Sequence, residues 1–189
     1  MENIYKSFRY TETIAKSAYE YIFNQISSAW NTKVKTNYEK VKEFHETFGM
    51  AIENEFSAPL LEDTKLVSLR LGLIDEEVAE LKEAIQNKDR KEVVDALSDI
   101  LYVVYGAGVS FGIDLDKAFD LVHKSNMSKV CETEEIAKET VEWYKKDGRY
   151  DSPAYKKSGD KFMVYNESTG KTLKSIHYKA VDLSDFVVN

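Results

Sequence analysis

The stretch Gly72–Gly106, GLIDEEVAELKEAIQNKDRKEVVDALSDILYVVYG, decides the fold of this 189-residue chain. Its periodicity predicts two helices joined by a short polar turn at Gln86–Asp89. At about 100° per residue, the apolar stripe of the first helix runs directly into three carboxylates. The residues that share this arc are Leu66, Leu69, Leu73, Glu76, Glu77, Glu80 and Ala84.

The second helix also gathers its acidic residues on one side. An arc of about 80° holds Glu92, Asp95, Asp99, Tyr102 and Gly106. The rest of its surface is nearly all apolar, which predicts a buried helix. Isolated buried carboxylates are strongly disfavoured, and neither arc contains Arg or Lys, so the pattern predicts a divalent cation. Oxygen ligands favour Mg²⁺ or Mn²⁺ over zinc.

A solvated helix face is the competing interpretation, because acidic residues at this spacing usually face water. In this chain the acids extend an apolar stripe on one helix and interrupt an almost continuous apolar surface on the next. That placement favours a metal site over a solvated face.

Composition sets the class of protein. The length suits one domain with a sizeable core, and only two prolines and eight glycines interrupt it, which suits long helices. The single cysteine, Cys131, excludes an internal disulfide and indicates a reducing, cytoplasmic setting. We expect no signal peptide, no membrane-spanning stretch and therefore no membrane partner.

Charge is unevenly distributed along the chain. The net charge of −7 argues against a nucleic-acid polymer as a partner. Residues 53–99 hold 13 acidic and 6 basic residues, whereas residues 149–179 hold 7 basic and 3 acidic residues. An acidic region for metal and a basic region for phosphate suit a protein that handles a metal-complexed polyphosphate.

The chain divides into three expected segments. Residues 1–36 form an aromatic-rich accessory helix, residues 37–148 a catalytic helical bundle, and residues 149–189 a basic tail. In the tail, residues 161–166 and 171–178 alternate on either side of a polar turn, which predicts a small β-hairpin.

Local signals predict where the helices begin and end. Gly49 is expected to end, as its C-terminal cap, a helix that begins near residue 38. Asp63 or Thr64 is expected to cap the first acidic helix, and Asp114 and Thr133 to cap two later ones.

Two acidic motifs, Asp75–Glu80 (DEEVAE) and Asp95–Gly106 (DALSDILYVVYG), follow each other in this chain. In this order they resemble the all-α nucleoside triphosphate pyrophosphohydrolases, a superfamily that contains the MazG-like enzymes, the dimeric dUTPases and phosphoribosyl-ATP pyrophosphohydrolase. Val122–Lys129 (VHKSNMSK) and Gly170–Ser175 (GKTLKS) agree with it. The resemblance implies an all-α, MazG-like helical bundle, here with an irregular C-terminal tail that contains the small β-hairpin.

The resemblance implies Mg²⁺-dependent cleavage of a nucleoside triphosphate to a monophosphate and pyrophosphate, with Mn²⁺ as an alternative ion. The catalytic candidates are Glu76, Glu77 and Glu80. The candidate metal ligands are Glu76, Glu77, Glu80, Glu92, Asp95 and Asp99. The candidate substrate-binding residues are His45, Phe48, Tyr102, Asn126, Lys129, Lys171 and Lys174.

One departure from the family pattern concerns the second motif. In the family this motif usually reads Glu-x-x-Asp. When the aspartate of the motif is aligned with Asp99, Ala96 takes the position of the glutamate. We expect Asp95 to take the missing role, with Glu92 in support. The register Glu92-x-x-Asp95 is the alternative.

The substrate and the assembly stay open at this stage. A uracil base, and hence dUTP, is favoured, and phosphoribosyl-ATP is the main enzymatic alternative. A catalytically inactive helical module that binds a partner protein is the alternative of another class. The family and the extensive apolar faces imply a homodimer or homotetramer.

Overall fold

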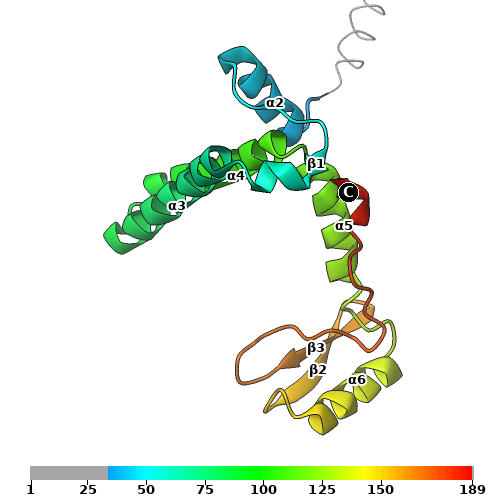
Figure 1. Cartoon of the computed structure of the whole chain (residues 1–189). Coiled ribbons are helices and arrows are strands. Elements are labelled where there is room, and N and C mark those ends of the chain that lie inside the picture. Colours follow the sequence, from blue (N-terminus) through cyan, green and yellow to red (C-terminus); the bar gives the residue numbers. More distant parts are fainter. Residues whose placement is uncertain (1–33, 189) are drawn as a thin grey trace, which may run out of the picture. The chain divides into compact units, whose positions relative to one another are not determined.

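The computed structural model describes residues 34–188 (Figure 1). The chain divides into two units between Thr36 and Asn37, and the description below concerns the second unit. The accessory helix expected within residues 1–36 therefore lies outside the described residues, apart from the last three positions of that segment.

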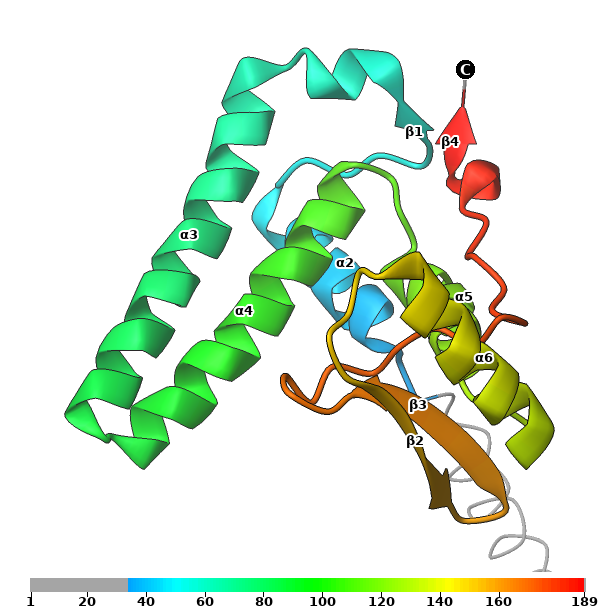
Figure 2. The same cartoon turned by 90° about the horizontal axis from the view of Figure 1, so that it is seen from below.

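Three helices form the acidic part of the fold: α2 (Asn37–Phe48), α3 (Thr64–Asn87) and α4 (Arg90–Ser110). Figure 2 shows α3 and α4 side by side as an antiparallel pair, and α2 packs against α4. Asp63 caps α3, because its side chain accepts hydrogen bonds from two backbone N–H groups of the first turn. The all-α bundle and its long helices are confirmed.

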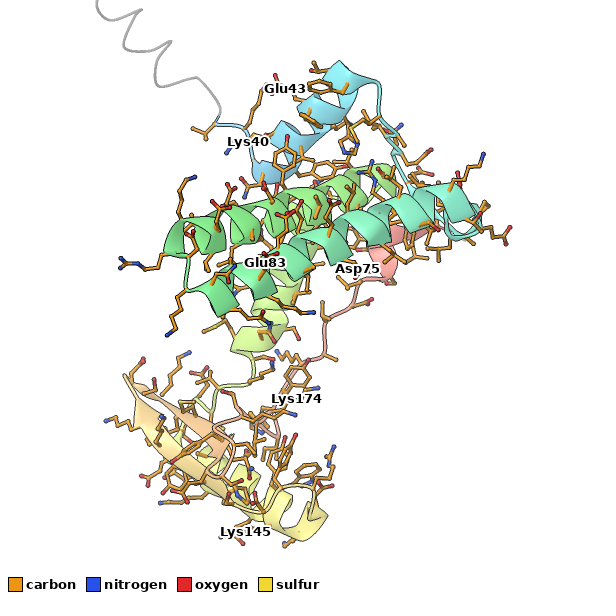
Figure 3. All side chains as sticks on the ribbon, turned by 90° about the vertical axis from the view of Figure 1, so that its left-hand side faces the viewer. Lys40, Glu43, Asp75, Glu83, Lys145 and Lys174 are labelled. Atoms are coloured by element: carbon orange, nitrogen blue, oxygen red, sulfur yellow. The ribbon has the colours of Figure 1, made fainter. Side chains whose placement is uncertain are left out.

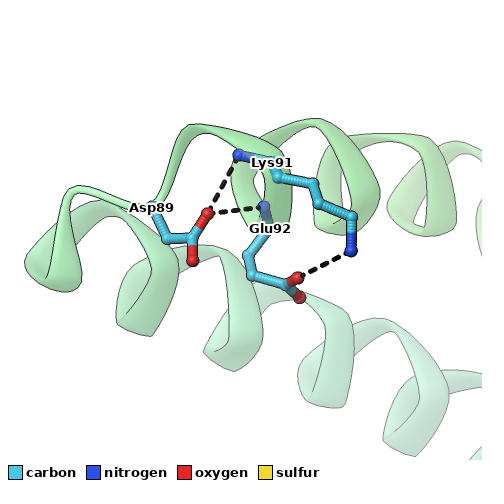
Figure 4. A network of polar contacts seen from close by, with 3 residues as sticks. All are labelled: Asp89, Lys91 and Glu92. Carbon is cyan, nitrogen blue, oxygen red and sulfur yellow. Dashed lines mark hydrogen bonds and ion pairs between the residues drawn. The ribbon is translucent and has the colours of Figure 1, made fainter.

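The connection between α3 and α4 is only two residues long. Lys88 takes a left-handed conformation with φ of 56°, which ends α3. Asp89 Oδ1 then accepts hydrogen bonds from the backbone N atoms of Lys91 at 3.0 Å and Glu92 at 3.2 Å (Figure 4). This cap restarts the helix at once and forces the two acidic helices to run back along each other.

The helix α5 (Leu115–Met127) is tied to the helices before it. Asp114 caps it, as expected. Asp116 accepts hydrogen bonds from the backbone N of Tyr38 at 3.0 Å and from Tyr105 Oη at 2.7 Å. One carboxylate thus links the start of α2, the middle of α4 and the first turn of α5.

The C-terminal half has its own hydrophobic core. The helix α6 (Glu134–Asp147) packs on the antiparallel strands β2 (Pro153–Ser158) and β3 (Lys161–Asn166). The buried residues of this core are Cys131, Ala137, Val141, Tyr144, Val164 and Leu173. A second, two-stranded parallel pairing joins β1 (Phe56–Ser57) to β4 (Val187–Val188), next to the C-terminus.

The expected hairpin exists, but its strands were wrongly assigned. Residues 161–166 form β3 as expected, yet β3 pairs with residues 153–158 and meets the 171–178 segment only at a single bridge, Tyr165 with Thr172. The turn is Gly159-Asp160, with Gly159 at φ of 64°. A two-residue Gly-Asp connection is a strong hairpin signal because its backbone matches the strand twist.

The prediction that α4 is buried is wrong for the single chain. Val94, Leu97 and Leu101 are 66%, 48% and 59% exposed. By length and composition Arg90–Ser110 could even cross a membrane, which corrects the expectation that no stretch is long enough. α4 packs along α3 with Ala96 buried, while Asp95 and Asp99 are exposed.

Candidate functional site

The acidic sides of α3 and α4 meet around Glu77. Its Oε2 is buried and has no hydrogen-bond partner among the described residues. Burial raises the pKa of Glu77, and the carboxylates of Glu80, Asp99, Glu76 and Asp95 raise it further, in that order. Both helices therefore contribute carboxylates to the surroundings of one buried oxygen.

The donor set around Glu77 suits a hard divalent cation. A buried carboxylate oxygen without a partner, among four like charges, is costly unless a positive charge is added. All of the donors are carboxylate oxygens, which Mg²⁺ and Mn²⁺ prefer. Within residues 34–188, however, no three His, Cys, Asp or Glu side chains are gathered closely enough to hold an ion as they stand. Glu76, Glu80, Asp95 and Asp99 are exposed, and the described carboxylates do not close into a ligand cage.

The second acidic motif is arranged with Asp95 and Asp99 toward Glu77. Glu92 instead forms an ion pair with Lys91, with 3.6 Å between Nζ and Oε1 (Figure 4), and it is absent from the charges that act on Glu77. Ala96 is 3% exposed, so its methyl group fills the contact between the helices where the family has a longer side chain. A cavity of about 320 Å³ lies at this end of the helix pair, lined by Glu80, Glu83, Ala84, Asn87, Asp89, Glu92 and Ala96.

Aromatic residues form a second group beside the acidic one. The Phe44 ring meets the edge of Tyr102 at 5.6 Å between centroids and lies 4.3 Å from the Phe48 ring. Phe48 is 66% exposed, whereas His45 is 2% exposed. His45 is buried, and its Nδ1 donates a hydrogen bond to the Ala51 carbonyl at 2.8 Å.

Arg70, on α3, is a polar residue that the sequence analysis passed over. It is 3% exposed, its Nε has no hydrogen-bond partner in the described part of the chain, and burial lowers its pKa. A methyl carbon placed on Gly106 would lie 3.3 Å from both Arg70 Nη1 and His45 Nε2. The available signal was its position seven residues before Glu77, which puts both residues on nearly the same side of α3.

The predicted lysines come together at another cavity, of about 840 Å³, in the C-terminal half. Lys129, Lys171 and Lys174 line it, and no carboxylate is among its lining residues. A hydrogen bond with Ser125 lowers the pKa of Tyr178, and the charges of Lys174 and Lys129 lower it further. The cavity is therefore a positive environment suited to an anion.

The candidate residues thus fall into three groups. The carboxylates lie on α3 and α4 around Glu77, the aromatic rings of Phe44, Phe48 and Tyr102 form the second group, and the lysines form the third. Figure 3 labels Asp75 and Glu83 on α3, and Lys174 on the segment after the hairpin. Asn126 belongs with the basic group, because its Oδ1 accepts a hydrogen bond from Lys129 Nζ at 2.7 Å. Among the described residues, the charges that shift the pKa of Glu77 are all carboxylates, with no lysine or arginine.

His45 predicts a pH dependence of stability. Burial lowers the pKa of His45 below its usual 6.5, and the charge of Arg70 lowers it further. Between the two pKa values, His45 is protonated in the unfolded chain and neutral in the folded chain. The stability that comes from the neutral, buried His45 is therefore present above about pH 6.5 and is lost as the pH falls toward the pKa of His45 in the folded chain. We expect the melting temperature of the wild type, measured from pH 7.5 to 5, to fall more steeply than that of His45→Gln. Parallel curves would contradict a neutral, buried imidazole.

Comparison with known proteins bears on this arrangement. Residues 41–126 match the family model of phosphoribosyl-ATP pyrophosphohydrolase, and the match covers α3, α4, all of the carboxylates and the ring group. The matched family belongs to the all-α nucleoside triphosphate pyrophosphohydrolase superfamily. The superfamily hydrolyses phosphoric anhydrides, so a hydrolase is the general activity expected of residues 41–126.

A viral relative extends the likeness beyond residues 41–126. An uncharacterized protein of Acanthamoeba polyphaga mimivirus is 29% identical to the chain, and the alignment covers 83% of this chain and 98% of that protein. The alignment therefore includes much of the sequence outside residues 41–126.

Proposed function

We propose that the protein is a Mg²⁺-dependent nucleoside triphosphate pyrophosphohydrolase of the cytoplasm, with dUTP as the favoured substrate. The observation that supports this proposal most is the buried, unpartnered Oε2 of Glu77 among four carboxylates from two helices. Such an oxygen is suited to a metal–polyphosphate complex and poorly suited to any role in water.

Each acidic residue has a proposed task. Glu77, Glu80, Asp95 and Asp99 would hold Mg²⁺, which when bound neutralises charge on the phosphate oxygens and makes water more acidic. Glu76 would help to hold a second metal ion, or would orient the attacking water and take its proton. The water oxygen bonds to the α-phosphorus, the bond from this phosphorus to the bridging oxygen breaks, and pyrophosphate leaves with the electron pair.

The remaining candidates would position the substrate. Lys129, Lys171 and Lys174 would steady the pyrophosphate by charge-assisted hydrogen bonds, with Asn126 fixing the direction of Lys129. Tyr102, with its neighbour Phe44, would support the nucleoside. His45 and Phe48 remain proposed members of the base pocket, although their exposure differs widely.

Removal of Glu80 tests the metal site. We expect Glu80→Gln to abolish release of pyrophosphate, because a neutral amide cannot replace a carboxylate ligand, while the helical content stays unchanged. The matched control is Asp75→Asn, which removes one carboxylate from α3 at an exposed position about 200° around the helix from Glu77. An active Glu80→Gln enzyme would place the metal site elsewhere.

The substrate is decided by a panel of nucleotides assayed with Mg²⁺ for pyrophosphate release. The name of the matching family model favours phosphoribosyl-ATP as a second candidate, so this compound belongs in the panel beside dUTP. If no compound is cleaved and added metal leaves the melting temperature unchanged, the chain is an inactive module. We also propose a homodimer or homotetramer, because the exposed apolar residues of α4 need a cover.

A further inference from the structure

Arg70 is a buried cation for which the described chain provides no counter-ion. The residue is 3% exposed, Nε lacks a hydrogen-bond partner, and burial is the one cause that shifts its pKa, with no carboxylate opposing it. A guanidinium stays charged in proteins, and an unpaired buried charge is strongly disfavoured. A ligand that supplies an acceptor would remove this cost.

His45 places an acceptor next to this donor. The carbonyl of Ala51 can only accept, so Nδ1 of His45 carries the hydrogen and Nε2 of the neutral ring presents a lone pair. Arg70 Nη1 and His45 Nε2 converge over Gly106, each 3.3 Å from the position that a methyl carbon there would take. The structure therefore pairs a charged donor with a neutral acceptor at one point.

The position along the helices indicates which part of a nucleotide arrives there. Arg70 precedes Glu77 by seven residues, which is about 10 Å along α3. On α4 the order is Asp99, Tyr102, Gly106, so the aromatic contact between Tyr102 and Phe44 lies between the carboxylates and the Arg70–His45 pair. A nucleotide whose phosphates lie at the carboxylates would place its sugar near Tyr102 and its base near Arg70 and His45.

We propose that Arg70 and His45 read the edge of the base and select a base with a carbonyl oxygen beside a ring N–H. This inference rests on the proposed function and limits its substrates to the nucleotides of uracil, thymine and guanine, which keeps dUTP and excludes phosphoribosyl-ATP. The guanidinium of Arg70 donates to the carbonyl oxygen, and His45 Nε2 accepts from the ring N–H. Cytosine and adenine offer an amino group instead, which has no lone pair for a buried cation and is repelled by it.

The test measures binding without catalysis. Titration calorimetry in EDTA compares dUMP, dTMP and dGMP with dCMP and dAMP for the wild type, Arg70→Met and the exposed-arginine control Arg90→Met. We expect the wild type and Arg90→Met to bind the first three about tenfold to a hundredfold more tightly. Arg70→Met should bind all five alike, and it should melt no lower than the wild type, because it removes an unpaired buried charge.

Three outcomes would overturn the inference. The wild type could bind all five nucleotides equally, the preference could survive in Arg70→Met, or Arg70→Met could lose the same affinity for all five nucleotides, which would assign Arg70 to the phosphate.

If Arg70→Met does not fold, Arg70→Lys serves the same purpose, because it keeps the charge and displaces the hydrogen-bond donors. Arg70→Lys should lose most of the preference among bases. A wild type that binds selectively in EDTA but cleaves no triphosphate with Mg²⁺ would contradict the hydrolase and leave the base reading standing.

Discussion

Replacing Glu77 by Gln is expected to abolish turnover and, at the same time, to stabilise the metal-free protein. Turnover should fall about a thousandfold, since a catalytic metal contributes several kcal/mol to the transition state. The free energy of unfolding should rise, because a neutral amide removes the repulsion between this carboxylate and its neighbours. The variant removes a charge that four neighbouring carboxylates oppose.

Two measurements check this expectation: pyrophosphate release with Mg²⁺, and urea unfolding in EDTA. Addition of Mg²⁺ should raise the melting temperature of the wild type and of Asp75→Asn, and should leave Glu77→Gln almost unchanged. A Glu77→Gln protein that unfolds more readily than the wild type in EDTA would show that the carboxylate accepts hydrogen bonds in the folded chain, and the metal-site proposal would then fail.

The second large effect is expected at Gly112, where α4 ends. Gly112 has φ of 72°, and a Cβ there would lie 2.6 Å from the backbone N and 2.7 Å from the backbone C of Glu55. The left-handed conformation costs about 1–2 kcal/mol, and a clash with backbone adds about 1–3 kcal/mol. We expect Gly112→Ala to lower the free energy of unfolding by about 2–5 kcal/mol in urea titrations.

Gly148 provides the matched control for this prediction. It ends α6 with φ of 75°, and nothing lies within 4 Å of a Cβ placed there. Gly148→Ala should therefore show the conformational cost alone. Equal losses for the two variants would contradict the close approach of the Glu55 backbone to the end of α4.

Helix boundaries and the acidic arcs could be predicted because they depend on neighbours within one or two turns. Asp63, Asp89 and Asp114 each accept hydrogen bonds from N–H groups two or three residues onward, a contact that the local sequence contains in full. The spacing of Glu76, Glu77 and Glu80 likewise fixes one side of α3 by helical geometry alone.

The hairpin shows where local evidence was misread. The alternation in residues 161–166 indicates a strand, but it does not show which segment pairs with that strand. The two-residue turn Gly159-Asp160 does show it, because so short a turn can pair the strand only with the segment directly before the turn. The longer turn after Asn166 was given too much weight.

The sequence by itself determined which residues form the helices and which sides of α3 and α4 are acidic, because both follow from repeat length and from capping. Only the tertiary structure decided that Glu77 Oε2 has no hydrogen-bond partner in residues 34–188, that Arg70 and His45 meet over Gly106, and that the lysines share a separate cavity. Burial and charge depend on which elements pack together, and residues as distant in sequence as His45 and Gly106 carry no local sign that they will meet.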